Sequence, residues 1–136
     1  MKAIFLFIAL ITLSKTSFSQ TIKAIPSDAP VVFVRVEIPP KFPGGDSAWK
    51  AYLQKNLDPT IPGKNGAPKG TYIVVVKFIV SKDSSISDVS TENMPGYGLE
   101  AEATRLIKTG PKWIPALQNG HIVNAYMRQP ITFVAK

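Results

Sequence analysis

The chain has 136 residues, a length that suits one domain with one hydrophobic core. It contains no cysteine, which excludes disulfide bonds and the lipid-carrying cysteine of a lipoprotein. Sixteen Lys and Arg against nine Asp and Glu give a net charge of +7, but the basic residues are spread singly along the chain, so no nucleic-acid partner is expected.

Residues 1–19 have the pattern of a secretory signal peptide. Lys2 precedes an apolar stretch, Ala3–Leu13, and small residues close the segment. We expect cleavage between Ser19 and Gln20, which leaves fourteen Lys and Arg against nine Asp and Glu on an exported, periplasmic protein of net charge +5. The alternative is a membrane anchor, but the apolar stretch would span only ~16 Å of a hydrocarbon core of ~30 Å. No stable membrane span is therefore expected after cleavage.

Residues 20–41 contain four prolines and predict an extended linker. Within this linker, residues 31–38 alternate between two sets of side chains, one of which is entirely apolar. This alternation is typical of a strand with one apolar face. The domain itself is expected to cover residues 42–136.

The first helix is predicted to run from Asp46, which can act as its N-cap, to about Asn56. Gly44 and Gly45 allow a sharp entry into it. The proline- and glycine-rich residues 58–70 predict a loop without a helix. One stripe of the first helix is expected in the core, formed by Trp49, Tyr52, Leu53 and Leu57.

Residues 71–81 are the strongest strand in the sequence, with apolar side chains on both faces. That pattern favours a central strand covered at least partly on both sides. A turn at 82–85 leads into a shorter and more polar strand, 86–92, which suits an outer position.

A second helix is predicted from Leu99, with Glu100 and Glu102 in its first turn, and it ends at Gly110 and Pro111. Trp113 is expected to be buried against it. Asn119-Gly120 then predicts a tight turn, followed by an alternating strand over 122–134. Pro130 lies inside this strand, and since proline cannot donate to a ladder, we expect an edge strand.

The predicted order is helix, strand, strand, helix, strand. This order indicates an α+β fold, in which a small antiparallel sheet carries both helices on one face. The outer face of the central strand would then leave Ile73, Val75 and Ile79 uncovered, unless residues 31–38 lie over them.

The sequence offers little support for catalysis. Residues 96–101 fit the dinucleotide pattern G-x-G-x-x-A, but the strand before them is polar and the helix after them begins with carboxylates that would repel a pyrophosphate. His121 is the single histidine, too few for a zinc site, and Glu100 and Glu102 do not face each other on a helix. We therefore expect no catalytic residue, no metal site and no cofactor.

Several short motifs occur in an order that points to one family. Phe42-Pro43-Gly44-Gly45 opens the region, Gly70-Thr71-Tyr72 leads into the strongest strand, Trp113-x-Pro115 follows the second helix, and Pro130-Ile131-x-Phe133 closes it. In this order and spacing the chain resembles the C-terminal domain of the TonB family, the periplasmic energy transducers of Gram-negative bacteria. The resemblance covers roughly residues 42–136.

The resemblance implies a non-enzymatic module with the strand at 71–81 in the middle of the sheet and the final strand at its edge. In the family, a short N-terminal segment of an outer-membrane receptor pairs with that last strand. The resemblance places the matching partner-binding residues at Val123, Asn124, Ala125, Tyr126, Met127, Arg128 and Gln129.

Two hypotheses remain open from the sequence. The first is a periplasmic module that binds receptor peptides by strand addition and modulates TonB-dependent transport, since the linker reaches at most ~70 Å and the single apolar segment is removed with the signal. The second is a self-associating scaffold of the cell envelope, a homodimer included, in which residues 31–38 close the sheet edge.

Overall fold

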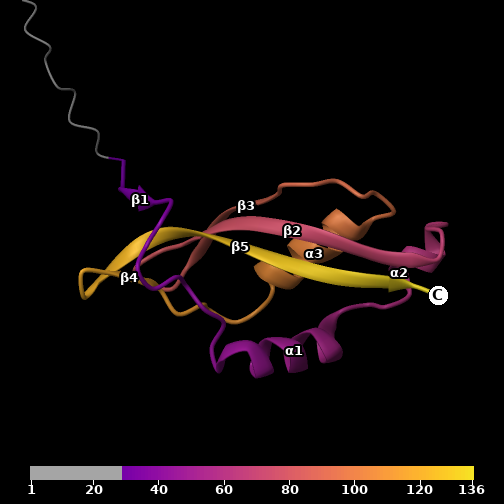
Figure 1. Cartoon of the computed structure of the whole chain (residues 1–136), viewed down its shortest axis with the longest axis horizontal. Coiled ribbons are helices and arrows are strands. Elements are labelled where there is room, and N and C mark those ends of the chain that lie inside the picture. Colours follow the sequence, from indigo (N-terminus) through magenta and orange to yellow (C-terminus); the bar gives the residue numbers. More distant parts are fainter. Residues whose placement is uncertain (1–28) are drawn as a thin grey trace, which may run out of the picture.

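The structure is a computed structural model that describes residues 29–136. The predicted signal peptide, the cleavage between Ser19 and Gln20 and the first part of the predicted linker lie outside the described residues. The elements are, in chain order, β1 (Val32–Phe33), α1 (Gly45–Asn56), α2 (Ile61–Lys64), β2 (Gly70–Val80), β3 (Ile86–Thr91), α3 (Leu99–Lys108), β4 (Ala116–Gln118) and β5 (His121–Ala135) (Figure 1).

The α+β fold class is confirmed, and the predicted helix, strand, strand, helix, strand order is present as α1, β2, β3, α3 and β5. The sheet is mixed rather than purely antiparallel, because β1 runs parallel to β5. Along the sheet the strands lie in the order β1, β5, β2, β3, and β4 pairs with β5 in a hairpin. The predicted outer position of the second strand, β3, is confirmed.

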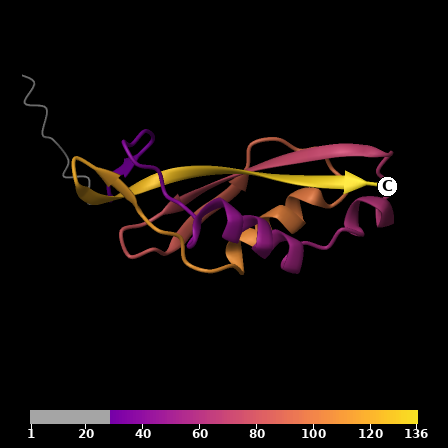
Figure 2. The same cartoon turned by 60° about the horizontal axis from the view of Figure 1, so that its bottom comes forward.

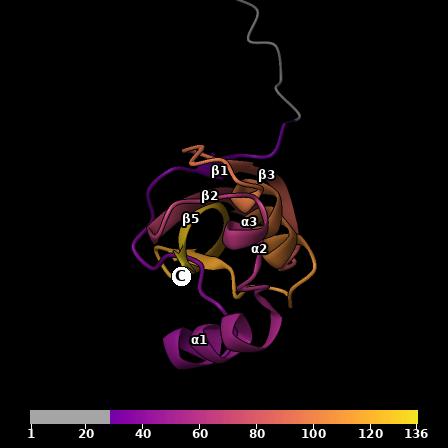
Figure 3. The ribbon, with the colours of Figure 1, turned by 90° about the vertical axis from the view of Figure 1, so that its right-hand side faces the viewer.

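The core lies between the sheet and the two longer helices. Figures 2 and 3 show α1 and α3 on the same side of the long strands β2 and β5. Val74, Val76 and Phe78 of β2 point to this side and are fully buried. Trp113 is 2% exposed, as expected, and its ring lies 5.1 Å from that of Phe78 and 5.7 Å from that of Trp49, so it joins both helices to the sheet.

The entry to α1 depends on glycine, not on a capping side chain. Gly44 is the N-cap residue with φ of 88°, and a Cβ there would lie 2.7 Å from the Cβ of Ala48. Asp46 lies in the first turn, so the prediction that it caps the helix is wrong. The left-handed turn at Gly44 already sets the start of α1 one residue earlier.

Two short elements were not predicted. Residues 58–70 contain α2, because a proline at the start of a helix loses no hydrogen bond and Pro62 stands there. β4 precedes the Asn119-Gly120 turn, where both residues have positive φ, 50° and 75°, and pairs with the start of β5. Three residues are too few to show an alternating pattern.

The outer face of the sheet is uncovered only in part. Ile73 is 49% exposed, whereas Ile79 is 6% exposed, so the expectation that both are uncovered is wrong for Ile79. Residues 31–38 do not account for a second layer in the pairings, since β1 joins the sheet beside β5 and Ile38 pairs with Leu117 next to β4.

Candidate functional site

The two sides of β5 differ in how far they are paired. On one side β2 pairs with it without a register shift, from Gly70 opposite Ala135 to Val80 opposite Ala125. On the other side β4 and β1 pair with residues 121–125 alone. The prediction of an edge strand is therefore wrong for the first five residues of β5. Among residues 29–136, no strand pairs with this side of β5 beyond Ala125.

The direction of the backbone along β5 follows from Val75 of β2. Its N–H donates to the Asn93 side-chain oxygen over 2.8 Å, and its carbonyl accepts from the Glu92 N–H over 2.9 Å, so both groups point away from β5. Pro130 lies opposite Val75. Because hydrogen-bonded and non-bonded pairs alternate along an antiparallel ladder, Pro130 and every second residue point away from β2. We call this outward-pointing backbone the open edge, formed by Tyr126, Arg128, Pro130, Thr132 and Val134.

Pro130 costs the sheet nothing and divides the open edge. Its missing N–H would have pointed outward, so the β2–β5 ladder keeps all its bonds. Its carbonyl accepts a hydrogen bond from the Gln129 side-chain amide over 3.2 Å. The position therefore offers no donor and a carbonyl that is already engaged, and it separates Tyr126 and Arg128 from Thr132 and Val134.

The seven residues suggested by the resemblance fall into two groups. Val123, Asn124 and Ala125 are paired within the chain, with Ala116, Val32 and Phe33 respectively. The remaining four, in the stretch from Tyr126 to Gln129, lie where the second side of β5 is unpaired among the described residues.

The side chains of Tyr126 and Arg128 are engaged on the outer face of the sheet. The ammonium of Lys77 lies 4.5 Å from the centre of the Tyr126 ring. Arg128 reaches across β2, and its Nε donates to the Glu92 carboxylate over 2.5 Å. These contacts hold the middle of β5 to its neighbours and leave its outward backbone free of them.

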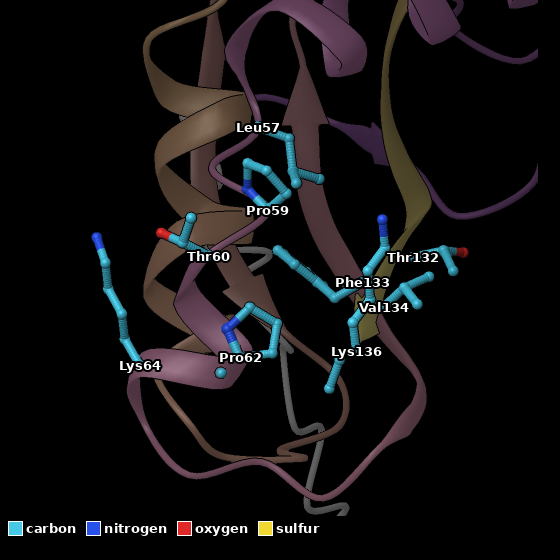
Figure 4. Close-up of a pocket in the computed structure, with 11 residues that line it drawn as sticks. Leu57, Pro59, Thr60, Pro62, Lys64, Thr132, Phe133, Val134 and Lys136 are labelled. Atoms are coloured by element: carbon cyan, nitrogen blue, oxygen red, sulfur yellow. The ribbon is translucent and has the colours of Figure 1, made fainter.

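A groove of about 660 Å³ lies beside the far half of the open edge. Figure 4 shows Leu57, Pro59 and Pro62 on one side of it, facing Thr132, Phe133 and Val134 of β5 on the other. The sequence analysis missed this wall, because residues 58–70 read as a structureless loop. We call the residues 57–64 that line the groove the groove wall.

A buried carboxylate fixes the start of the groove wall. Glu102 of α3 is 6% exposed and accepts the Asp58 N–H over 3.2 Å. Arg105 donates to Glu102 through Nε over 2.9 Å and to the Asn56 carbonyl over 2.8 Å. The hydrogen bond from Arg105 holds the pKa of Glu102 below its ordinary value, against the burial that raises it.

Asp58 and Asn65 complete the attachment of this segment. The Asp58 carboxylate accepts the Thr60 hydroxyl over 2.5 Å and the Thr60 N–H over 2.9 Å, and these bonds lower the pKa of Asp58. At the other end the Asn65 side-chain amide donates to the Tyr97 carbonyl over 2.8 Å. The groove wall is therefore tied to α3 and to the loop before it at both ends.

The opposite border of the sheet, on β3, is irregular. The register between β2 and β3 shifts between Lys77 and Ile79, and Asp88 in the bulge has φ of 50°. Bulges and charged residues are common on edges that do not accept another strand.

The residues considered for catalysis have structural roles in the described chain. Gly96, Tyr97 and Gly98 all have positive φ, and the Glu100 carboxylate accepts the Gly96 N–H over 2.7 Å, at the helix start where a phosphate would bind. His121 is exposed at the start of β5. No cluster of three or more metal-ligating side chains occurs among residues 29–136.

Comparison with known proteins identifies the region that contains the open edge. Residues 70–135 match the family model described as the Gram-negative bacterial TonB protein C-terminal. The match runs from the start of β2 to the end of β5 and leaves the groove wall outside it. No curated protein and no solved structure matches the chain. None of the helices in the described part of the chain is long and apolar enough to cross a membrane.

Proposed function

We propose that this chain, whose residues 70–135 form a domain of the TonB C-terminal family, is a non-enzymatic binding module that docks an extended peptide by adding it as a strand to β5. Domains of this family are in general non-enzymatic, are associated with the periplasm and interact with outer-membrane proteins. The proposed partner is the N-terminal segment of an outer-membrane receptor, and the proposed location is the periplasm.

The observation that supports this proposal is the open edge. Four outward N–H groups, of Tyr126, Arg128, Thr132 and Val134, alternate along a strand whose other side is held by an uninterrupted ladder. A rigid strand with free donors and acceptors is what strand addition requires, because backbone hydrogen bonds supply the affinity. The bulged border on β3 is a poorer surface for it.

The geometry moves the proposed docking segment along β5. Val123, Asn124 and Ala125 already have partners in β4 and β1, so an added strand has access from Tyr126 onward. We propose docking along Tyr126–Val134, which keeps Tyr126, Met127, Arg128 and Gln129 of the original set and extends beyond them. By this proposal the chain contributes to TonB-dependent transport through receptor binding.

The scaffold hypothesis has one observation in its favour. β1 already occupies the start of the same side of β5, and the Asn124 side-chain amide donates to the Val31 carbonyl over 3.3 Å. Exchange of this segment between two copies would join them. The pairing is two residues long, which is short for a stable link between chains, so we place receptor docking first.

The test is a titration of the ¹⁵N-labelled chain with synthetic N-terminal peptides of outer-membrane receptors, followed by NMR. Strand addition should shift the amide signals of Tyr126, Arg128, Thr132 and Val134 more than those of Ser87 and Val89 on β3. Peptide binding that leaves the four β5 amides unmoved would contradict the proposal. Light scattering of the same sample separates peptide docking from self-association.

A further inference from the structure

We infer that the groove is a side-chain subsite for a bulky apolar residue of the docked peptide, held beside Thr132 and Val134. This inference rests on the proposed function and adds the chemistry of the partner and the place where it is read. Its occupant is an extended peptide whose inward side chain at this point is aromatic or a large aliphatic.

The first support is continuity with the β1–β5 pairing. β1 uses the same side of β5, and Phe33, opposite Ala125, packs with Ala116, Val123 and Ala125 on the inner side of the sheet. A strand that continues along the open edge also places every second side chain on that inner side. At the level of Phe133 an inward side chain would enter the groove.

The second support is the lining of the groove. Leu57, Pro59, Pro62 and Phe133 supply apolar surface, and none of the eleven lining residues is acidic or aromatic apart from Phe133. Lys64 is paired with Asp58 at 3.9 Å, and Figure 4 shows its side chain extending away from Thr132. A surface of this kind suits an apolar side chain and offers no partner to a basic one.

The third support is that the groove wall is already in place without a peptide. Glu102 and Arg105 hold Asn56 and Asp58, and Asn65 is held by its bond to Tyr97. A preformed wall needs little reordering when a side chain enters, which favours binding. Because the wall lies outside residues 70–135, the open edge supplies the part of docking found in the family match and the wall supplies selectivity of this chain.

The fourth support is the division of the open edge at Pro130. Hydrogen bonding alone is interrupted there, so Thr132 and Val134 offer a short ladder at the far end. A side chain held in the groove would secure this half of the peptide, where two backbone donors are few for stable pairing.

Gly63 allows the groove to be narrowed without disturbing the fold. It lines the groove, its φ is not positive, and a Cβ built on it meets nothing within 4 Å. Gly63→Trp should therefore fill space in the groove, and Gly63→Ala is the matched control with the same backbone change. Circular dichroism and thermal unfolding of both variants check that each is folded.

The experiment uses two blocked peptides of about nine residues, the length of the open edge, made of alternating Thr and Val with one central residue that is either Phe or Ala. By calorimetry the unaltered chain should bind the Phe peptide about 10- to 100-fold more tightly. Gly63→Ala should keep this preference, and Gly63→Trp should reduce it to about 2-fold or less with the affinity for the Ala peptide unchanged.

Each outcome separates the inference from the function on which it rests. Equal affinity for the two peptides, with shifts of the β5 amides by both, overturns the subsite and leaves strand addition standing. A full Phe preference in Gly63→Trp also overturns the subsite. Peptides that move no β5 amide contradict strand addition itself, and a mass that doubles on peptide addition assigns the edge to a second copy of the chain.

Discussion

Pro130 lies opposite Val75 in the β2–β5 ladder, with its nitrogen on the side away from β2. A residue that cannot donate therefore occupies the one kind of position in β5 where the sheet does not need a donor. The loss is confined to the open edge, which makes Pro130 a natural control on how strongly that edge can pair.

Replacing Pro130 with Thr should restore the missing donor and strengthen peptide docking. One added backbone hydrogen bond is worth about 0.5–1.5 kcal/mol, so the affinity for a receptor peptide should rise about 2- to 10-fold. Self-association should rise as well, because a longer free edge pairs more readily. Calorimetry and light scattering measure the two effects, and an unchanged affinity would show that the edge at this point is not used.

Removing a donor from the open edge should harm docking and spare the fold. Thr132→Pro deletes an outward N–H on an exposed residue, so the free energy of unfolding should change by less than about 1 kcal/mol while peptide affinity falls about 2- to 10-fold. Met127→Pro is the contrast, because its N–H points into the β2 ladder, and it should cost at least about 2 kcal/mol. Urea unfolding of both variants, together with peptide titration of Thr132→Pro, tests the assignment of directions, which fails if the two prolines cost the same.

Glu102→Gln should lower stability in a pH-dependent way. The carboxylate is buried against Arg105 and the Asp58 N–H, so its loss should cost about 1–3 kcal/mol at pH 7. The folded-state pKa of Glu102 is lowered, so its contribution is complete above the unfolded pKa of about 4.3 and is lost as the pH falls through the folded value. Urea unfolding at pH 7 and pH 3 should therefore show a smaller difference between variant and unaltered chain at pH 3. A difference that grows in acid would contradict this assignment.

Deleting residues 20–40 should lengthen the free side of β5. Loss of the pairings of Val32 and Phe33 frees Asn124 and Ala125, so peptide-induced amide shifts should extend back to Asn124. If the scaffold hypothesis is right, the deletion should also convert a dimer into a monomer, which light scattering would detect. Identical monomers before and after the deletion would remove that hypothesis.

Gly44→Ala should destabilise the fold where Gly63→Ala does not. At Gly44 the φ of 88° and the 2.7 Å approach to Ala48 oppose any side chain, and a cost of about 1–3 kcal/mol is expected. At Gly63 neither obstacle is present, and the change should be within about 0.5 kcal/mol. Thermal unfolding of the pair would reveal an error in the backbone at the entry to α1 if the two costs were equal.

The long elements were predictable because their patterns are carried by many residues. The strand at β2 and the inward residues of β5 alternate over more than ten positions, and the stripe of α3 recurs at helical spacing, so periodicity alone located them. The burial of Trp113 followed from its place between helix and strand.

The groove wall was not predictable, because its order comes from distant residues. Glu102 was weighed as half of an acid–base pair, whereas it binds the N–H of Asp58, 44 positions earlier in the sequence. Nothing in residues 58–70 alone marks that contact. The pairing of residues 121–125 was hidden for the same reason, since β1 and β4 are too short to show which strand they accompany.

The bulge at Asp88 sets the valency of the molecule. A sheet with two regular borders can take one guest on each side and so grow into a fibre of stacked copies, chain upon chain. Here one border is kinked, so a molecule that has accepted a strand on β5 presents no second regular border to pass the growth on. One guest per molecule is the stoichiometry that this asymmetry allows.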